Sequence, residues 1–218
     1  MNKLLIYNKS LSRGGAERVT VYLANYMVKR GIKCEILTEK VAHKEYEVPN
    51  GVKRTSLRSK GYFSKIREAR KAIKVSGADI VLVMDVTNCV YAIPATRGLN
   101  VKIIVSERND PLYYLGKTIV KIYYRVLMRF ADGLVFQTQA AKDFYSKKLR
   151  GRGEIIFNPL FTDGLPDVYV GERKKQFVNL GRLHKQKNQE MLINAFSMIA
   201  DKHPDFYLVI YGECGLRA

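Results

Sequence analysis

The sequence predicts an α/β fold, in which a complete Rossmann-like domain with a parallel sheet is followed by the first part of a second Rossmann-like domain. Strand-like apolar runs alternate with amphipathic helical runs over most of the 218 residues, which is typical of a parallel sheet covered by helices. Residues 159–175 are rich in Pro and Gly, and the alternation starts again after them. These two observations predict two domains joined by a linker.

The first domain is expected to span residues 1–158. Its expected strands are short apolar runs between polar segments, at 3–7, 33–38, 52–57, 79–84, 101–105, 133–136 and 154–157. Within the strand expected at 79–84, residues 80–84 are continuously apolar, which indicates a parallel strand buried on both faces. Its expected helices are segments with apolar residues at helical spacing, at 15–30, 62–75, 88–97, 117–130 and 140–149.

The linker at 159–175 is followed by strands expected at 176–180 and 206–211 and a helix expected at 188–201. Two strands and one helix are too few to enclose a core of their own. We therefore interpret residues 176–218 as the start of a truncated C-terminal domain.

The positive charge is confined to the first domain. The chain carries a formal net charge of +18, and residues 1–158 contain 30 Lys and Arg against 13 Asp and Glu. Such a charge attracts anionic partners, namely nucleic acid, an anionic membrane surface or a phosphorylated substrate. The recognised nucleic-acid-binding motifs are absent, so no nucleic acid partner is expected.

The composition favours a cytoplasmic protein without a cofactor. Apolar runs stay far below the roughly 20 residues of a membrane-spanning helix, and the N-terminal run is too short for a signal peptide. Cys34, Cys89 and Cys214 are far apart and lack the spacing of zinc or redox motifs. We expect thiols in a reducing compartment, no metal and no other cofactor.

The loop between the first strand and the first helix contains Gly14 and Gly15. Doubly wound folds bind phosphates at this place, where glycines allow close approach and helix N–H groups face an anion. A tight turn with a helix cap is the alternative. The third glycine of the dinucleotide fingerprint is missing, which argues against a hydride-transferring enzyme.

A second candidate anion site is the segment from Gly181 to Asn188, which joins a strand to a helix. It places Arg182 and Lys187 at the helix N-terminus. A lysine in the first turn of a helix is poorly placed against the helix dipole, so its position suggests a bound anion. The alternative is a solvated loop arginine and a first-turn lysine.

Five motifs occur in a characteristic order. They are Gly-Gly-Ala-Glu-Arg-Val at 14–19, Ser-Glu-Arg-Asn-Asp-Pro at 106–111, Asn158-Pro159, Gly-Arg-Leu-x-x-x-Lys-Asn at 181–188, and Gly-Glu-x-Gly-Leu-Arg at 212–217. The ordered set covers the whole chain and resembles the family 4 glycosyltransferases of the GT-B fold. The resemblance implies two facing Rossmann-like domains, a nucleotide-sugar donor held mainly by the C-terminal one, and transfer with retention at the anomeric carbon.

The resemblance also implies roles for individual residues. Arg182 and Lys187 would neutralise the donor diphosphate and stabilise the charge of the leaving nucleotide. The backbone at Gly14 and Gly15 would approach the same diphosphate from the other domain. Glu107 and Arg108 follow an expected strand and would position the acceptor as catalytic residues, although many relatives have a histidine near this region. A local ion bridge is the alternative for this pair.

Two departures from the family pattern lie near the end of the chain. Cys214 stands where relatives often have glycine. The acidic pair that relatives carry further into the C-terminal domain has no counterpart. We therefore expect the 218-residue form to be inactive or nearly so.

The segment 117–130 combines four cations with large apolar residues. The cations recur at four-residue spacing, as Lys117, Lys121, Arg125 and Arg129. The segment is interpreted either as a core helix with one solvated basic stripe or as a helix that docks on an anionic membrane surface. A second basic cluster with aromatic residues between its members supports docking, at Lys53, Arg54, Arg58, Lys60, Lys65, Arg67, Arg70, Lys71 and Lys74.

The function expected from these observations is that of a retaining glycosyltransferase. It would move a hexose or N-acetylhexosamine from a nucleotide sugar, with UDP as the expected nucleotide, to a lipid-linked glycan. The expected setting is bacterial surface polysaccharide or O-antigen assembly on the inner face of the plasma membrane. The alternatives are a basic nucleic-acid-binding module and a non-catalytic phosphate-binding module.

Overall fold

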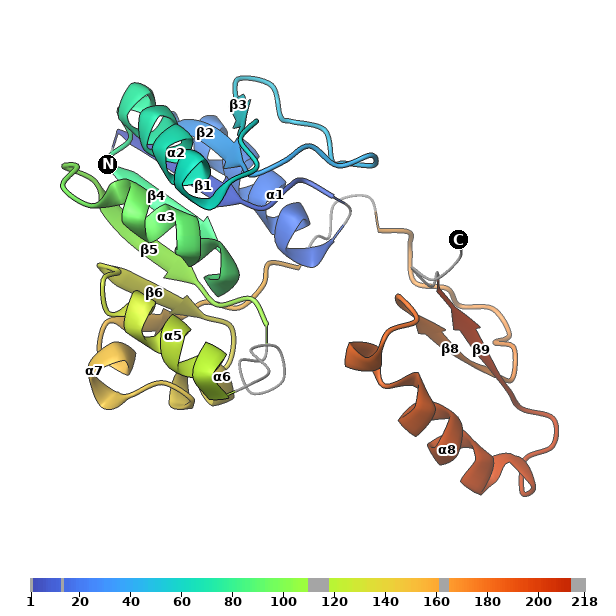
Figure 1. The fold of residues 1–218 in the computed structure, drawn as a ribbon. Coiled ribbons are helices and arrows are strands. Elements are labelled where there is room, and N and C mark those ends of the chain that lie inside the picture. Colours follow the sequence, from blue (N-terminus) through green and yellow to red (C-terminus); the bar gives the residue numbers. More distant parts are fainter. Residues whose placement is uncertain (1, 13, 110–117, 161–164, 213–218) are drawn as a thin grey trace. The chain divides into compact units, whose positions relative to one another are not determined.

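The computed structural model describes residues 2–12, 14–109, 118–160 and 165–212. The chain divides into two compact units, Met1–Phe161 and Thr162–Ala218 (Figure 1). None of the helices in these ranges is long and apolar enough to cross a bilayer.

The first unit is built on a seven-stranded sheet in which all neighbouring strands are parallel. Its strands are β1 (Lys3–Asn8), β2 (Lys33–Thr38), β3 (Lys53–Ser56), β4 (Ile80–Met84), β5 (Lys102–Ser106), β6 (Gly133–Phe136) and β7 (Gly153–Ile155). Their order is β3-β2-β1-β4-β5-β6-β7, which confirms the predicted fold class. The order reverses between β1 and β4, and ligands of open α/β sheets bind at such a switch point, outside the carboxyl ends of the strands.

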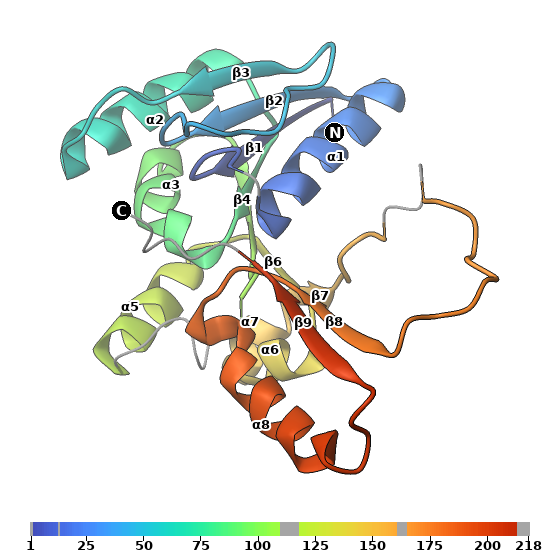
Figure 2. The same ribbon diagram turned by 90° about the vertical axis from the view of Figure 1, so that its right-hand side faces the viewer.

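Helices cover both faces of this sheet. They are α1 (Gly15–Lys29), α2 (Tyr62–Ser76), α3 (Cys89–Thr96), α5 (Thr118–Met128), α6 (Gln139–Asp143) and α7 (Lys147–Arg150), with a 3₁₀ turn η1 at Val86–Asn88. Figure 2 shows α1 on one face and α2 and α3 on the other. Because side chains alternate along a strand, Leu4 and Ile6 pack with α1, whereas Leu5 and Tyr7 belong to the core under α2 and α3.

The prediction of one helix over 140–149 was wrong, because the segment forms the two short helices α6 and α7. The break lies at Ser146, whose extended backbone (ψ 154°) precedes α7. Tyr145 beside the break is almost fully buried. The interruption thus allows the Tyr145 ring to reach the core.

The second unit contains β8 (Gln176–Leu180), a 3₁₀ turn η2 (Lys185–Lys187), α8 (Gln189–Ala200) and β9 (Tyr207–Tyr211). The two strands are parallel neighbours. Phe177 packs its ring against Phe196 and Phe206, with both centroid distances at 5.9 Å. Within residues 165–212 no side chain is classed as buried, so this part of the unit encloses no core of its own.

Candidate functional site

Polar side chains gather at the carboxyl edge of the first unit's sheet. Asp85 follows β4, Glu107 follows β5 and Gln137 follows β6. Because the carboxyl ends of neighbouring parallel strands meet at one edge, these residues lie close to the switch point. The sequence predicted Glu107 and Arg108 at this edge.

Glu107 is the buried centre of this group, with 1% of its surface exposed. The Tyr145 hydroxyl donates to its Oε2 at 2.6 Å, and the backbone N–H groups of Arg108 and Asn109 donate to its Oε1 at 3.1 and 3.3 Å. Burial, with a smaller contribution from the charge of Asp85, raises the pKa of Glu107 to about 7. The carboxyl group can therefore gain or lose a proton near neutral pH.

The Arg108 side chain contacts Asn158, whereas a local ion bridge would require it to contact the Glu107 carboxylate. Its Nη1 donates to Oδ1 of Asn158 at 2.8 Å, and Gln137 donates to the same oxygen at 2.7 Å. Among the described residues, Glu107 and Arg108 form no side-chain ion pair. Burial lowers the pKa of Arg108 to about 10, and its Nε is buried without a hydrogen-bond partner. The guanidinium is thus held by the Asn158 amide, and its Nη2 lies 3.8 Å from the Met84 sulfur.

Asp85 adopts a backbone conformation that is unusual for an L-residue, with φ at +82°. Such strain costs roughly 1–3 kcal/mol and often occurs at functional sites. Its carboxylate accepts from the N–H and hydroxyl of Thr87, both at 2.9 Å, and from the Asn109 amide. Burial raises the pKa of Asp85. The residue therefore links the end of β4 to the segment that carries Glu107 and Arg108.

The glycine loop begins helix α1. Gly14 is the N-cap residue, and a Cβ placed on it would collide with the Glu17 carboxylate. A Cβ on Gly15 would meet no atom within 4 Å. The structure therefore leaves space beside Gly15, whereas the Glu17 side chain covers Gly14.

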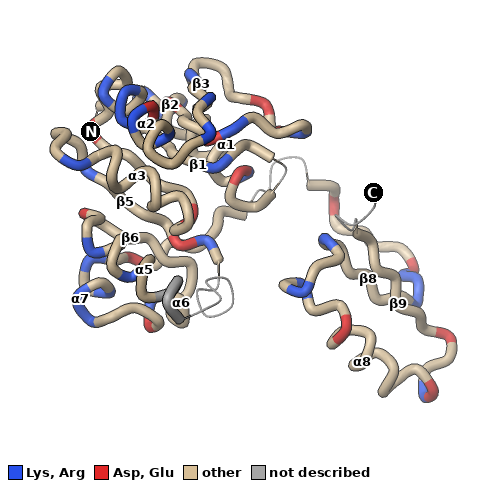
Figure 3. The backbone as a smooth tube through the Cα atoms, viewed as in Figure 1, with Lys and Arg blue, Asp and Glu red and all other residues tan. Residues whose placement is uncertain are grey.

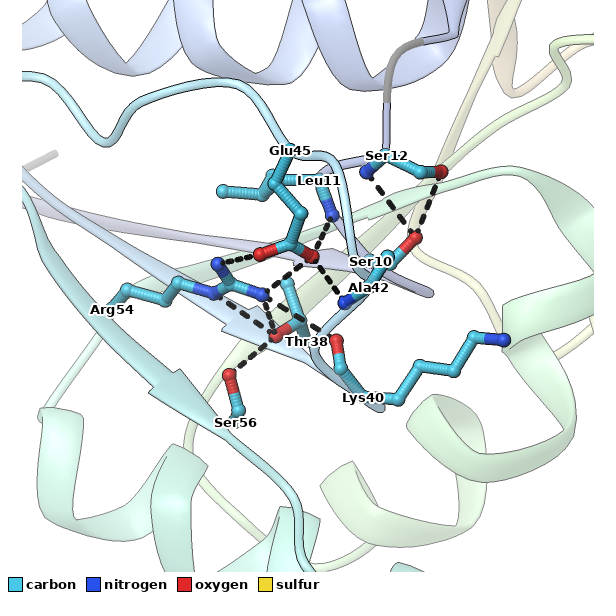
Figure 4. A network of polar contacts seen from close by, with 9 residues as sticks. All are labelled: Ser10, Leu11, Ser12, Thr38, Lys40, Ala42, Glu45, Arg54 and Ser56. Atoms are coloured by element: carbon cyan, nitrogen blue, oxygen red, sulfur yellow. Dashed lines mark hydrogen bonds and ion pairs between the residues drawn. The ribbon is translucent and has the colours of Figure 1, made fainter.

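A partly buried ion pair holds the segment that leads into this loop (Figure 4). Glu45 accepts from the N–H groups of Leu11 and Ala42 at 3.1 and 2.9 Å, and Arg54 donates to both of its carboxylate oxygens at 2.5 and 3.0 Å. These hydrogen bonds, with that of Arg54 the largest cause, lower the pKa of Glu45 to about 2. Bidentate pairing of this kind fixes geometry, so the backbone at Leu11 is anchored through Glu45 to Arg54 on β3.

The second candidate anion site lies in the second unit, between β8 and α8. Lys187 is part of η2 and not of the first turn of α8, because Asn188 adopts a left-handed conformation (φ +50°) between them. The aliphatic stem of Lys187 runs beside Gly181, and Gln189 donates to the Arg182 carbonyl at 2.8 Å. Both cationic side chains are exposed, and neither forms an ion pair with a described residue.

A surface hollow of about 490 Å³ opens at the same loop and the start of α8. It is lined by His184, Lys185, Asn188, Gln189 and Glu190. His184 accepts from the N–H of Gln186 at 3.2 Å through Nδ1. The local fold thus brings Arg182 and Lys187 into one exposed loop, as the sequence motif suggested, and adds a polar hollow next to it.

The basic stripe of segment 117–130 can be placed only in part. Lys117 lies outside the described residues, and the side chain of Lys121 is not described. Arg125 lies over the Phe144 ring, 4.2 Å from its centroid, and donates to the Phe144 carbonyl at 2.9 Å. Arg125 and Arg129 line a hollow of about 330 Å³. Arg125 is therefore partly engaged with the protein, whereas Arg129 is exposed.

Several of these residues had no signal in the sequence. Tyr145 lies 38 positions from Glu107, in a segment that resembled an ordinary surface helix. The backbone strain at Asp85 and the pairing of Glu45 with Arg54 depend on tertiary contacts. Within the described ranges, no group of three or more His, Cys, Asp and Glu residues is placed to hold a metal ion.

Comparison with known families assigns most of the chain. The model described as Glycosyltransferase Family 4 matches residues 13–163. A second model, described as Glycosyl transferases group 1, matches residues 167–217. Together they cover both units.

Curated relatives share this relationship at the level of sequence. A Campylobacter jejuni protein is 30% identical over all of this chain and 63% of its own length; its name is GalNAc-alpha-(1->4)-GalNAc-alpha-(1->3)-diNAcBac-PP-undecaprenol alpha-1,4-N-acetyl-D-galactosaminyltransferase. An uncharacterized glycosyltransferase of Haemophilus influenzae is 25% identical over 93% of this chain and 59% of its own length. The chain thus spans about 60% of the length of these relatives.

Solved structures of low sequence identity have the same fold. The apo form of the lipopolysaccharide outer core galactosyltransferase WaaB matches with a TM-score of 0.68 and 18% identity, over 98% of this chain and 61% of that one. HepE of Anabaena, in complex with UDP and glucose, matches with a TM-score of 0.70 and 15% identity, over 98% of this chain and 62% of that one.

Proposed function

Because this chain belongs to glycosyltransferase family 4 and has the GT-B fold, we propose that the protein transfers a sugar from a nucleotide sugar to a lipid-linked glycan. The transferred sugar is a hexose or N-acetylhexosamine, and the anomeric configuration is retained. The observation that carries the proposal is the exposed pair of Arg182 and Lys187, which has no ion-pair partner among the described residues. In the proposed function, this pair binds the diphosphate of the nucleotide sugar.

On the donor side, Arg182 and Lys187 neutralise the diphosphate of the nucleotide sugar. Negative charge develops on the leaving nucleotide as the glycosidic bond breaks, and fixed cations stabilise that charge. In this proposal the two side chains supply the positive charge, and the reaction needs no metal or other cofactor. UDP is the proposed nucleotide, because the similar HepE structure contains UDP and glucose.

On the acceptor side, Arg108 contacts the acceptor and Glu107 acts as its positioning residue. Both carboxylate oxygens of Glu107 are occupied by donors from Tyr145, Arg108 and Asn109. Glu107 therefore holds the backbone that carries Arg108, whose side chain is partly exposed at this edge of the sheet. In this proposal the positive charge of the guanidinium attracts the anionic acceptor.

The proposed acceptor also defines the proposed setting. The Campylobacter jejuni relative acts, by its name, on an undecaprenol diphosphate glycan, and a lipid of this kind stays in a membrane. The protein would then work on the inner face of the plasma membrane, as a peripheral enzyme of bacterial surface polysaccharide or O-antigen assembly. The excess of positive charge in residues 1–158 supports this location.

A calorimetric titration of the protein tests the donor assignment. UDP, UDP-glucose and UDP-N-acetylgalactosamine are compared with GDP-mannose and with a single-stranded oligonucleotide. We expect a UDP-sugar to bind and the oligonucleotide to bind only weakly and in a salt-dependent manner. Tight oligonucleotide binding without affinity for any nucleotide sugar would contradict the proposal.

The acceptor and the stereochemistry are tested in a transfer assay on a form of the protein as long as its curated relatives, with the 218-residue form, which we expect to be inactive or nearly so, assayed beside it. The protein is incubated with the UDP-sugar that binds best and with an undecaprenol-diphosphate-linked glycan, and the product is examined by NMR. We expect the new glycosidic bond to have the same anomeric configuration as the donor. A product of inverted configuration would contradict retention while leaving the family assignment intact.

A further inference from the structure

Helix α5 exposes an apolar stripe. Ile122, Tyr123 and Val126 of α5, together with Phe130 two residues after its end, keep between 42% and 52% of their surface exposed. With about 100° of rotation per residue, the three helical positions occupy roughly one quarter to one third of the helix circumference. The opposite side holds Met128, which is fully buried in the core. The outer face of the helix and its inner face are therefore both apolar.

The stripe continues onto the start of α2. Phe63 is the most exposed aromatic residue among those described, at 81%. The side chain of its neighbour Tyr62 is hydrogen-bonded to that of Tyr123; burial, with a smaller contribution from Tyr62, raises the pKa of Tyr123. The ring of Tyr62 also lies 5.7 Å from that of Tyr91 on α3. We call the resulting patch the α2–α5 apolar surface; it consists of Tyr62, Phe63, Ile122, Tyr123, Val126 and Phe130.

Cations border the α2–α5 apolar surface. The Arg97 guanidinium lies 5.0 Å from the centroid of Phe130, and Lys65 lies 4.8 Å from that of Tyr91. Arg129, the first residue after α5, is exposed next to the stripe. Figure 3 shows the blue Lys and Arg positions along α2. Glu68 is the single acidic residue within the bounds of α2, α3 and α5, and its carboxylate accepts from the backbone N–H groups of Arg58 and Ser59.

This combination favours one occupant. Contiguous exposed apolar patches mark surfaces that bind a partner or a membrane. Aromatic and aliphatic side chains with a rim of cations suit the boundary between acyl chains and anionic headgroups. A second copy of the chain on this surface would place cations opposite cations, which is unfavourable.

We propose that the α2–α5 apolar surface docks on an anionic bilayer, with Phe63 and the α5 stripe inserted at the level of the headgroups. The proposal rests on the proposed function, because a lipid-linked acceptor requires the enzyme to reach a membrane. It also makes the apolar residues, and not the cations alone, responsible for attachment. Cations attract the protein over a distance, and the buried apolar area retains it.

Co-sedimentation with vesicles tests the proposal. The protein is mixed with phosphatidylcholine vesicles that contain or lack phosphatidylglycerol. The test variant is Phe63→Ser/Ile122→Ser/Val126→Ser, and Phe63→Ser alone is a second variant at a position too exposed to affect folding. The matched control is Tyr26→Ser/Val41→Ser/Val75→Ser, which also replaces one aromatic and two aliphatic side chains that are largely exposed.

We expect the wild type to bind the anionic vesicles and the triple test variant to bind at least about tenfold more weakly. Phe63→Ser should fall between the two, and the control variant should bind within about twofold of the wild type. Vesicle binding by the triple variant at the level of the control would overturn the proposal, as would a wild type that does not bind. A wild-type dimer that Phe63→Ser converts to a monomer would instead identify a second copy as the occupant.

The calorimetric titration separates this proposal from the proposed function. The triple variant should bind a UDP-sugar as the wild type does, because its substitutions lie outside the candidate donor site. If the wild type binds a UDP-sugar but does not bind the vesicles, the docking proposal alone is overturned. Retained vesicle binding without donor affinity overturns the proposed function alone.

Discussion

The two candidate sites differ in how the protein holds its charged groups. At the carboxyl edge of the first sheet, Glu107 is 1% exposed and both of its carboxylate oxygens accept hydrogen bonds. In the loop between β8 and α8, Arg182 and Lys187 are exposed and form no ion pair with a described residue. The first site is part of the folded core, and the second is a surface loop.

This difference predicts which substitutions change the free energy of unfolding and which change donor binding. A buried charge depends on its hydrogen-bond partners, so its removal changes the free energy of unfolding. An exposed cation loses little when it is replaced, unless a ligand uses it. Substitutions at the β8–α8 loop should therefore affect donor binding alone, whereas those at the sheet edge should affect folding as well.

The largest effect is expected for Arg182→Ala/Lys187→Ala. Each charged hydrogen bond to the diphosphate contributes about 1.5–3 kcal/mol, so the double variant should bind a UDP-sugar at least about 100-fold more weakly. Its free energy of unfolding should stay within about 0.5 kcal/mol of the wild type. Isothermal calorimetry and urea unfolding measure the two quantities.

The control for this variant is Arg173→Ala/Lys202→Ala, which removes the same charge from exposed positions of the second unit. It should leave donor affinity nearly unchanged. If both double variants weaken binding equally, the effect comes from net charge, and the assignment of Arg182 and Lys187 to the diphosphate is wrong.

A smaller effect, on stability, is expected for Glu107→Gln. The pKa of Glu107 is raised from 4.5 to about 7 in the folded protein, so the folded state binds the proton more strongly than the unfolded state. This group therefore lowers stability as pH rises from about 4.5 to about 7, by up to about 3 kcal/mol in total. The variant lacks this carboxyl group, so its free energy of unfolding should rise relative to that of the wild type as pH increases.

Urea unfolding at about pH 5 and about pH 8 measures this difference. Glu154→Gln is the matched control, because Glu154 is an exposed carboxylate at the same end of the sheet. The free energy of unfolding of the control should differ from that of the wild type by the same amount at both pH values. If Glu107→Gln behaves in the same way, the carboxyl group of Glu107 does not titrate in this range.

The sequence predicted best those features of the structure that depend on residues close together in the chain. The apolar run at 79–84 became the central strand β4, and the position after the next strand placed Glu107 at the sheet edge. Arg182 and Lys187 lie within one short loop, so their proximity follows from the local chain. Periodicity and strand order are enough for such conclusions.

What the sequence could not predict depends on distant segments. Tyr145 reaches Glu107 only because the chain breaks at Ser146, and the broken helix is set by core packing. Asp85, which has a positive φ, accepts a hydrogen bond from Asn109, 24 residues further along the chain. The α2–α5 apolar surface requires two helices to lie near each other, which their sequences do not specify.

The smallest effect is expected for Gly15→Ala, the first residue of α1. The position has no neighbour within 4 Å of an added Cβ and lacks a positive φ, so alanine should raise the free energy of unfolding by about 0.4–1 kcal/mol. If the glycine serves close approach of the donor diphosphate, donor affinity should nevertheless fall. Gly151→Ala is the matched control, because this glycine also has a negative φ, an added Cβ would make only ordinary contacts, and the residue lies outside the glycine loop. A Gly15→Ala protein that is more stable and binds the donor as before would limit the role of this glycine to the turn.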